Sequence, residues 1–327
     1  MHIRSDNMDI RCLPLLFGLT EAESLSVLTA GHINTTYLAV CSNKKYILQA
    51  LSSNVFQRPE AVMRNISCIE SAFSKADSTD IAVPHFIDCG DKNYAEADGK
   101  LWRMYKYISA SAGASATAEA AGRAFGAFIR VMDGQSIAPE PVIDGFHDYD
   151  RYFAALAEKN QTDRSTLATL DKLRDSLGQI FTDSLKKRII HGDAKPDNLI
   201  ISEKTTIIDL DTVMYGYAAA DYGDLVRSVC RGKELELSVI SVVTNGFSHG
   251  LNGILNHDEV NSLYYGVLWL TGELAVRYLT DSQSDEKYFK GKSSAECLAR
   301  AEELLHQLDM FDSHSGEIID IIHSHME

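Results

Sequence analysis

The sequence predicts an α+β fold, in which a small N-terminal lobe built on an antiparallel sheet is joined by a hinge to a mainly helical C-terminal lobe. Residues 24–50 alternate apolar and polar side chains in three short bursts, which is typical of an antiparallel meander. Small, flexible residues at 109–122 mark a change of composition. From residue 234 onward, apolar residues recur with helical periodicity. We therefore expect two lobes, at 1–108 and at 109–327.

Length and charge limit the class of protein. A chain of 327 residues is long enough for two lobes with their own cores. A net charge of −15 argues against binding nucleic acid or an anionic membrane through bulk electrostatics. No apolar stretch approaches the length of a membrane span, and the apolar run at 12–19 lacks a small-residue cleavage site after it. The six scattered cysteines suit reduced thiols, so we expect a cytoplasmic protein; its oligomeric state is left open.

The N-terminal lobe is predicted from three features of the first 108 residues. The bursts within 24–50 are SLSVLTA, TTYLAV and KYILQAL, separated by GHIN and CSNKK. A helix is expected at about 59–76, because Pro59 suits its first turn. VPHFIDC (83–89) and KLWRMYKYI (100–108) are predicted to form a second hairpin.

The C-terminal lobe is predicted to be helical around one short stranded segment. Phe125, Phe128 and Ile129 have the spacing of a core-facing helix. His147 and Asp148 could carry chemistry, but we prefer them as an N-terminal cap for a helix that starts near residue 148. Further helices are expected at about 163–185, 235–246, 258–280 and 295–310.

The segment 188–212, RIIHGDAKPDNLIISEKTTIIDLDT, holds three short, β-branched, apolar runs. Runs of this length bounded by turn residues are typical of short buried strands. The first two flank a polar loop, and the third leads into Asp209. The predicted strands are 188–190, 199–201 and 206–208.

The polar loop carries side chains suited to phosphoryl transfer. His191, Asp193, Lys195 and Asn198 follow at spacings of two, two and three. Transfer from ATP needs a carboxylate that orients and deprotonates the acceptor hydroxyl, a cation for the moving phosphoryl group, and oxygen ligands for Mg²⁺. Asp193 suits the first role and Lys195 the second, and Asn198 and Asp209 suit the third. Asp193 alone could be a turn cap, but the whole pattern favours a catalytic loop.

HGDAKPDN followed by IIDLD resembles the catalytic loop and metal-binding strand of the protein-kinase-like fold, in its aminoglycoside phosphotransferase family. Several other segments are similar to N-acetylhexosamine 1-kinases and their bacterial relatives. They follow in the right order, and a weaker match continues at 277–289. These segments are GHINTTYLAV (31–40), YILQ (46–49), MRNI (63–66), WRMYKYI (102–108), IIDLDTVM (207–214) and DYGDLVR (221–227).

The resemblance implies a protein-kinase-like two-lobed fold, with a nucleotide-binding lobe at 1–108 and a catalytic and substrate-binding lobe at 109–327. ATP and Mg²⁺ would lie in the cleft between the lobes. On the residues alone, the first turn could equally be an ordinary hairpin turn, because it contains a single glycine. The resemblance favours nucleotide binding through side-chain donors there, and adenine contacts from main-chain groups at the hinge. The implied nucleotide-binding residues are Gly31, His32, Asn34 and Thr35 in the first turn, and Lys106, Tyr107 and Ile108 at the hinge.

The third strand departs from the general kinase pattern. Gln49 stands where that pattern has a lysine paired with a glutamate on the next helix. The next helix offers Asn65 and Glu70 rather than an obvious partner. An amide donates a hydrogen bond but carries no charge. The hexosamine kinases also read YILQ, so we expect Gln49 at the nucleotide, with Lys195 and the metal carrying the phosphate charge.

Two residues late in the chain are candidates for substrate binding. Arg277 lies in the otherwise apolar GVLWLTGELAVRYL, where a guanidinium is expensive to bury without a partner. The resemblance implies that Arg277 and Tyr288 touch the sugar or phosphate. The alternative for Arg277 is a structural ion pair or a side chain that reaches the surface. In DYGDLVR, either Asp221 or Asp224 is expected to accept backbone N–H bonds from the catalytic loop.

The resemblance and the catalytic residues predict an ATP- and Mg²⁺-dependent kinase of a small-molecule sugar. Its acceptor would be the anomeric hydroxyl of N-acetylglucosamine, N-acetylgalactosamine or a related hexose, oriented by Asp193. The main alternative is the same chemistry on an aminoglycoside, choline, homoserine or methylthioribose, of which the cationic ones need acidic or aromatic linings. A catalytically silent nucleotide-binding protein has only Gln49 in its favour.

Overall fold

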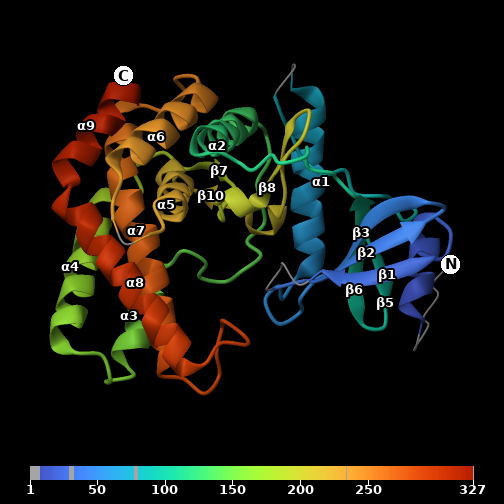
Figure 1. Ribbon diagram of the computed structural model, residues 1–327, viewed down its shortest axis with the longest axis horizontal. Helices are drawn as coiled ribbons and strands as arrows, with labels where there is room; N and C mark the ends of the chain where they lie inside the picture. The colour runs from blue at the N-terminus through green and yellow to red at the C-terminus, as the bar shows by residue number, and fades with distance from the viewer. Residues whose placement is uncertain (1–7, 29–32, 77–79, 233, 327) are drawn as a thin grey trace.

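The computed structural model describes residues 8–28, 33–76, 80–232 and 234–326. A small antiparallel sheet lies at one end of the molecule and most of the helices lie at the other (Figure 1). The predicted α+β class, with a small N-terminal sheet and a mainly helical remainder, is confirmed.

The N-terminal sheet has five strands, and neighbouring strands are antiparallel throughout. A 3₁₀ helix, η1 (Ile10–Phe17), buries Leu13 and Phe17 in the same core as one face of this sheet. The predicted meander is therefore present, and the strand predicted at 100–108 is present over Lys100–Lys106. In spatial order the strands are β1 (Ser24–Leu28), β2 (Thr35–Cys41), β3 (Lys44–Ala50), β6 (Lys100–Lys106) and β5 (Ala95–Ala97).

The prediction of a strand at 83–89 is wrong. β6 pairs with β5 instead, and residues 83–89 contribute a single bridge to it, between Phe86 and Tyr105. Pro84 has no backbone N–H to give to a ladder, which keeps this segment from pairing continuously. The hairpin that precedes the hinge is thus shorter than the sequence pattern suggests.

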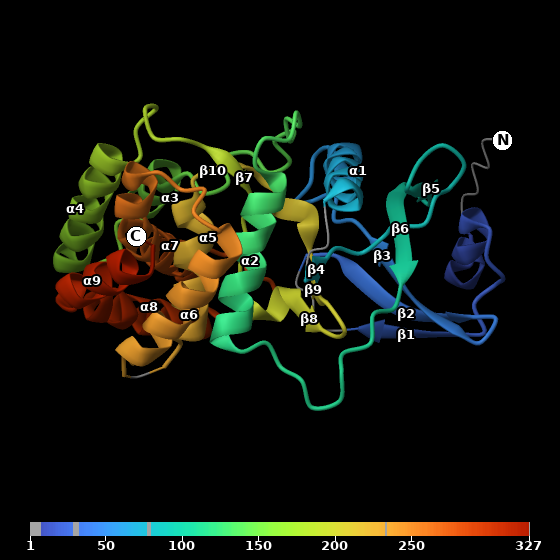
Figure 2. The ribbon, with the colours of Figure 1, turned by 90° about the horizontal axis from the view of Figure 1, so that it is seen from above.

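One helix and one short strand link the two parts of the molecule. Helix α1 (Pro59–Lys75) starts at Pro59 as predicted, and lies between the sheet and the helices in both ribbon views (Figures 1 and 2). Its buried residues share one apolar core with those of helix α2 (Ala118–Met132). After α1, strand β4 (Ile81–Ala82) pairs in parallel with β9 (Thr205–Ile207), which belongs to the second half of the chain.

The rest of the C-terminal part is built around one long helix, α7, whose N-terminus carries a capping box formed by Asn256 and Glu259. No described helix has the length and apolar character needed to cross a bilayer. Besides α2, the helices are α3 (Tyr149–Ala157), α4 (Arg164–Ile180), α5 (Ala218–Val229), α6 (Leu237–Leu251), α7 (His257–Ser282), α8 (Ser294–Ser313) and α9 (Ser315–Met326).

Helices α2 and α6 touch through glycines. A Cβ added to Gly122 would lie 2.2 Å from the Val243 carbonyl oxygen, and one added to Gly246 would lie 2.1 Å from a carbonyl oxygen of α2. Gly126 and Gly250 are equally close to the opposite backbone. The two helix backbones are therefore in direct contact, without side chains between them.

Candidate active site

The catalytic segment folds into two small antiparallel pairs of strands. Strand β7 (Arg188–Ile190) pairs with β10 (Met214–Gly216), and β8 (Leu199–Ile201) pairs with β9. The predicted strands at 188–190 and 199–201 are confirmed, and the third lies one residue earlier than predicted. Short 3₁₀ helices, η2 (Pro196–Asn198) and η3 (Leu210–Thr212), fill the connections after the catalytic loop and after β9.

Three of the predicted catalytic residues meet in one hydrogen-bonded group. Lys195 Nζ donates to Asp193 Oδ2 (2.6 Å), and Asn198 Nδ2 donates to the same oxygen (2.9 Å) and to the Asp193 carbonyl (2.8 Å). Among the described residues, none donates to Asp193 Oδ1. That oxygen is free to accept the proton of a substrate hydroxyl.

The lysine keeps this carboxylate charged. Burial would raise the pKa of Asp193, but the charge and hydrogen bond of Lys195 outweigh burial and hold the pKa below its usual range. Burial would likewise lower the pKa of Lys195, and Asp193 raises it instead. Both groups are therefore ionised near neutral pH, and Asp193 is an available but weak base.

Asp209 has the features of a metal ligand. It adopts the left-handed conformation (φ 59°) two residues after the end of β9 and accepts no hydrogen bond from any described residue. Burial, followed by the nearby charges of Asp211 and Asp193, raises its pKa to about 7. Its neighbour Ile208 donates its N–H to the Asn198 carbonyl (2.9 Å), which brings Asn198 to the same end of the hairpin.

The side-chain oxygens of Asn198 and Asp209 suit Mg²⁺ as ligands. The Asn198 amide nitrogen is used by Asp193, so its Oδ1 is left as an oxygen ligand at the same end of the hairpin as Asp209. No group of three or more His, Cys, Asp or Glu side chains with metal-binding geometry occurs in the part of the chain that the structure describes. Mg²⁺ in phosphoryl-transfer sites is commonly held by one or two protein oxygens together with substrate phosphates, as this arrangement allows.

Asp221, rather than Asp224, holds the catalytic loop. Its two carboxylate oxygens accept the backbone N–H groups of His191 and Gly192, both at 2.8 Å. Asp224 pairs with Arg227 on its own helix. Gly192 has φ +77°, and a Cβ there would lie 2.5 Å from the Thr212 carbonyl oxygen, so the loop requires glycine.

His147 supports the catalytic loop from the other side. Its Nε2 lies 2.9 Å from the Gly192 carbonyl and its Nδ1 lies 3.1 Å from Glu273 Oε1. Both partners are acceptors, so the ring carries a proton on each nitrogen. Burial alone would lower the pKa of His147, and Glu273 raises it above its usual value. The predicted cap is formed by Asp148 alone, which accepts the Arg151 N–H at 3.0 Å.

Arg277 is buried against aromatic rings and a carboxylate. Its Nη1 lies 3.6 Å from Glu273 Oε1, so the alternative of a structural ion pair describes part of its environment. Its guanidinium carbon lies 5.1, 4.5 and 5.5 Å from the ring centroids of Tyr152, Tyr288 and Phe289, which we call the aromatic cage. Tyr288 is 46% exposed. Because Glu273 also binds His147, the cage lies close to the catalytic loop.

A family model described as "Phosphotransferase enzyme family" matches residues 24–241, which is most of the chain. The chain belongs to this family. The predicted membership of the aminoglycoside phosphotransferase family is thereby confirmed, and the catalytic segment lies wholly inside the matched region.

Solved structures of low sequence identity share the fold of this phosphotransferase. A microcompartment-associated aminopropanol kinase is 15% identical, with a TM-score of 0.71 over 95% of this chain and 98% of that chain. A spectinomycin phosphotransferase in complex with ADP and spectinomycin is 16% identical (TM-score 0.61; 98% and 99% covered). An aminoglycoside phosphotransferase from Alicyclobacillus acidocaldarius is 12% identical (TM-score 0.62; 93% of both). The predicted kinase-like two-lobed fold is confirmed.

The predicted nucleotide-binding turn of the phosphotransferase is described only in part. Gly31 and His32 lie outside the described residues. Asn34 donates from Nδ2 to Asp211 Oδ2 (2.7 Å) and accepts the Ser52 N–H at 3.1 Å. Thr35 is exposed at the start of β2. Asn34 thus ties the turn to the segment after Asp209, and direct contact of this turn with phosphate stays a prediction.

The predicted hinge follows β6 directly. Lys106 is the last residue of β6, and the Tyr107 N–H donates to the Lys45 carbonyl of β3 (3.0 Å). The Ile108 N–H has no acceptor among the described residues. This N–H suits the predicted main-chain contact with adenine, which stays a prediction.

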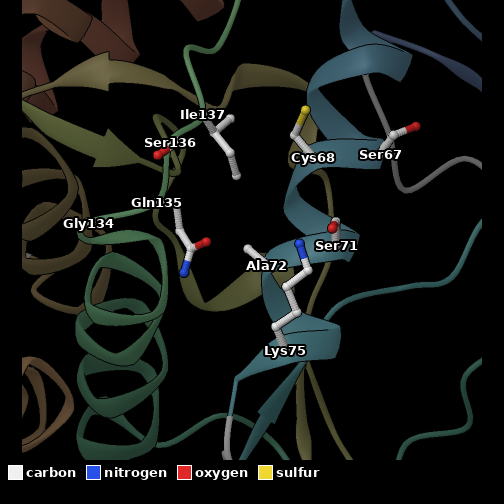
Figure 3. Close-up of a pocket in the computed structure, with 9 residues that line it drawn as sticks. All are labelled: Ser67, Cys68, Ser71, Ala72, Lys75, Gly134, Gln135, Ser136 and Ile137. Carbon is white, nitrogen blue, oxygen red and sulfur yellow. The ribbon is translucent and has the colours of Figure 1, made fainter.

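Two cavities in the phosphotransferase lie away from the catalytic loop. One of about 470 Å³ lies between α1 and the segment after α2 (Figure 3), where Ser67 and Cys68 come from α1 and Gln135 from the other wall. The second, about 460 Å³, is lined by Glu70 and His85 among others. None of the predicted site residues lines either cavity, so we assign the substrate to neither.

Proposed function

We propose that this phosphotransferase is an ATP- and Mg²⁺-dependent kinase that phosphorylates the anomeric hydroxyl of N-acetylglucosamine, N-acetylgalactosamine or a related hexose. The similarity to N-acetylhexosamine 1-kinases motivates the proposal. One observation carries it: the aromatic cage beside the catalytic loop is filled by the protein's own cation, Arg277.

This observation favours a neutral acceptor over a cationic one. Ammonium substrates are recognised by carboxylates or by the faces of aromatic rings. Here the cage already holds a guanidinium, and the buried Glu273 is shared between Arg277 and a protonated His147. Two cations face one carboxylate, so a further positive charge would be repelled. An uncharged sugar could stack on the exposed part of Tyr288 and accept hydrogen bonds from Arg277.

Transfer would be direct. The acceptor oxygen attacks the γ-phosphorus of ATP, the bond from that phosphorus to the β,γ-bridging oxygen breaks, and ADP leaves. Asp193 Oδ1 receives the hydroxyl proton, while Lys195 lies beside the same carboxylate and places positive charge near the moving phosphoryl group. Asn198 and Asp209 would hold Mg²⁺, which neutralises developing negative charge when bound.

The lowered pKa of Asp193 also supports the anomeric hydroxyl as the acceptor. A carboxylate stabilised by Lys195 is a weak base, and weak bases deprotonate the more acidic alcohols most readily. In a reducing sugar the anomeric hydroxyl is the most acidic one. The base and the proposed position of phosphorylation are therefore matched.

We also propose that the lobes meet between Lys106 and Ser111 and that the protein acts in the cytoplasm. The Ser111 N–H donates to the Ile201 carbonyl of β8 (2.8 Å). The chain therefore reaches the hairpin of β8 and β9 within five residues of the end of β6. This supports the predicted boundary near residue 108.

The test is product analysis with purified protein, ATP–Mg²⁺ and a panel of hexoses and amino alcohols. We expect turnover of N-acetylglucosamine or N-acetylgalactosamine, and a product whose phosphorus is coupled to H1 in NMR. A 6-phosphate would refute the anomeric assignment. Turnover of ethanolamine or aminopropanol, with no hexose accepted, would refute the sugar proposal as a whole.

A further inference from the structure

The residue that orients Gln49 does not come from α1. In the general kinase pattern a glutamate of this helix holds the strand lysine. Asn65 instead bonds both backbone groups of Glu140, at 2.9 Å each. Glu70 accepts the Phe86 N–H at 2.7 Å. Both candidate side chains of α1 are thus engaged away from β3.

Arg103 contacts Gln49 instead. The two residues lie directly opposite each other on β6 and β3, so their side chains share one face of the sheet. Arg103 Nε donates to Gln49 Oε1 at 3.0 Å. The terminal nitrogens of Arg103 form a bidentate ion pair with Asp211, in which Nη2 lies 3.0 Å from Oδ2. Arg103 is 2% exposed and Asp211 is 3% exposed.

The guanidinium fixes which way the Gln49 amide faces. Arginine has only donors, so the amide must turn its oxygen toward Arg103. Its nitrogen then points the other way and donates to Thr36 Oγ1 at 3.0 Å. Thr36 follows the turn that we expect over the nucleotide phosphates. With lysine at position 103, the single ammonium could not hold Gln49 and both oxygens of Asp211 in the same fork.

The same ion pair joins the sheet to the metal-binding segment. Asp211 comes two residues after Asp209, on η3. Besides Arg103 it binds Asn34 from the turn before β2. Strand β6 and the turn before β2 are thus both anchored on one carboxylate, two residues after the predicted Mg²⁺ ligand. Bidentate arginine–carboxylate pairs fix orientation as well as distance.

We propose that Arg103 is the positioning residue that takes the place of the missing lysine–glutamate pair. It turns the Gln49 amide nitrogen, one N–H of which donates to Thr36, toward the nucleotide phosphates. It also holds the N-terminal sheet in register with the segment that carries Asp209. The inference rests on the proposed nucleotide site.

The test compares two buried arginines. Arg188 is also bidentate to a buried carboxylate, Glu259 (2.5 and 2.9 Å). It begins β7, and its other partners, Asp133 at the end of α2 and the Ile254 carbonyl after α6, belong to the helical part rather than to the sheet. Both R103K and R188K are expected to lower the melting temperature. Calorimetry with Mg²⁺–AMP-PNP, below both melting transitions, should show roughly tenfold weaker binding for R103K and binding within about twofold of wild type for R188K. Equal nucleotide affinity in R103K and wild type would leave Arg103 a purely structural role and overturn the proposal.

A double-mutant cycle tests the route through Gln49. If Arg103 acts by orienting this amide, Q49A and R103K should weaken nucleotide binding non-additively, with the double variant close to R103K. The KM for ATP should rise in both, while the KM for the acceptor stays near wild type. Fully additive losses would show that Arg103 does not act through Gln49.

Failure of the two proposals can be told apart. If wild-type protein binds no Mg²⁺–AMP-PNP, the nucleotide site itself is wrong and the proposed function falls with it. If wild type binds and R103K binds equally, only the role of Arg103 is wrong.

Discussion

The catalytic loop and the residues that hold it in place differ in how far apart their partners lie in the sequence. Within the loop, Asp193 is bound by Lys195 and Asn198, two and five residues away. The contacts that fix the loop and the segment that carries Asp209 join residues much further apart in the sequence. His147 binds Gly192 across 45 residues, Arg103 binds Asp211 across 108, and Asn34 binds Asp211 across 177.

This difference separates chemistry from positioning. The side chains of Asp193, Lys195 and Asn198 are brought together by the backbone of one loop. Folding of that loop is therefore enough to form their hydrogen bonds. Long-range contacts exist only after the sheet and the helices have come together. Changes within the loop should therefore affect kcat most, and changes to the long-range contacts should appear mainly in KM or stability.

The largest effect is expected from Asp193→Asn, which keeps the shape and hydrogen bonding of the side chain but removes the base. General-base loss typically costs about 10²- to 10⁴-fold in rate, so kcat should fall by at least that order, with nucleotide affinity little changed. Steady-state kinetics and calorimetry on the same preparation measure both quantities. A variant that keeps more than about a tenth of wild-type kcat would mean that Asp193 is not the base.

The next largest effect distinguishes the role of Lys195 from that of Gln49. Removing one transition-state electrostatic contact costs about 10²- to 10³-fold in kcat, and we expect that loss for Lys195→Ala. Gln49→Ala removes an uncharged amide and should lower kcat by less than about tenfold. Gln49→Lys should not raise activity, because Arg103 already faces that position. If the two alanine variants lose kcat equally, the division of roles between them is wrong.

A smaller effect is expected from substitution of Arg277, the proposed sugar-binding residue. Arg277→Ala should raise the KM for the sugar by at least about tenfold, the order of one charged hydrogen bond, because the bound sugar loses its fork of donors. The KM for ATP should stay near wild type. Tyr288→Phe is the matched control, since it keeps the ring of the cage. Parallel rises of both KM values in Arg277→Ala would indicate a general loss of structure.

The smallest effect concerns stability and its dependence on pH. The pKa of His147 is raised in the folded protein by Glu273, with Arg277 on the same helix and Asp224 on α5 also nearby. Stabilisation by the protonated ring is fully present below the unfolded pKa of about 6.5 and is lost as pH rises through the folded pKa. His147→Gln should cost about 2 kcal/mol at low pH.

Urea unfolding of wild type and His147→Gln across pH 5.5 to 9 measures this difference. We expect the gap between the two proteins to narrow as pH rises. A gap that is independent of pH would show that the charge on His147 contributes nothing, and that only its shape matters.

The loop chemistry could be predicted from sequence because its pattern is local. The strands around it were placed to within one residue, since short β-branched runs between turn residues have few other ways to fold. The same reasoning failed at 83–89, where alternation suggested a strand and Pro84 prevented continuous pairing.

The long-range contacts could not be predicted, and each for a physical reason. Arg103 lies in a strand that is buried on both faces, so no alternation distinguishes an inward-facing arginine from an outward-facing one. His147 precedes a clear helix cap, and its left-handed backbone (φ 59°), which turns the ring toward Gly192, leaves no mark in the residue pattern. Whether Asp221 or Asp224 holds the loop depends on which carboxylate faces β7, and a spacing of three on one helix does not decide that.

The glycine contact between α2 and α6 bears on how acceptor preference could be altered by directed evolution. Phe125 and Phe128 of α2 pack edge-on against the His191 ring, with centroids 5.3 and 5.8 Å away. A methyl group at Gly122 or Gly246 would separate the helices and shift those rings. Randomisation is therefore better confined to Tyr152 and the residues around Tyr288. Variants with larger residues at the glycines would be lost from any screen for new acceptors, whichever acceptor was sought.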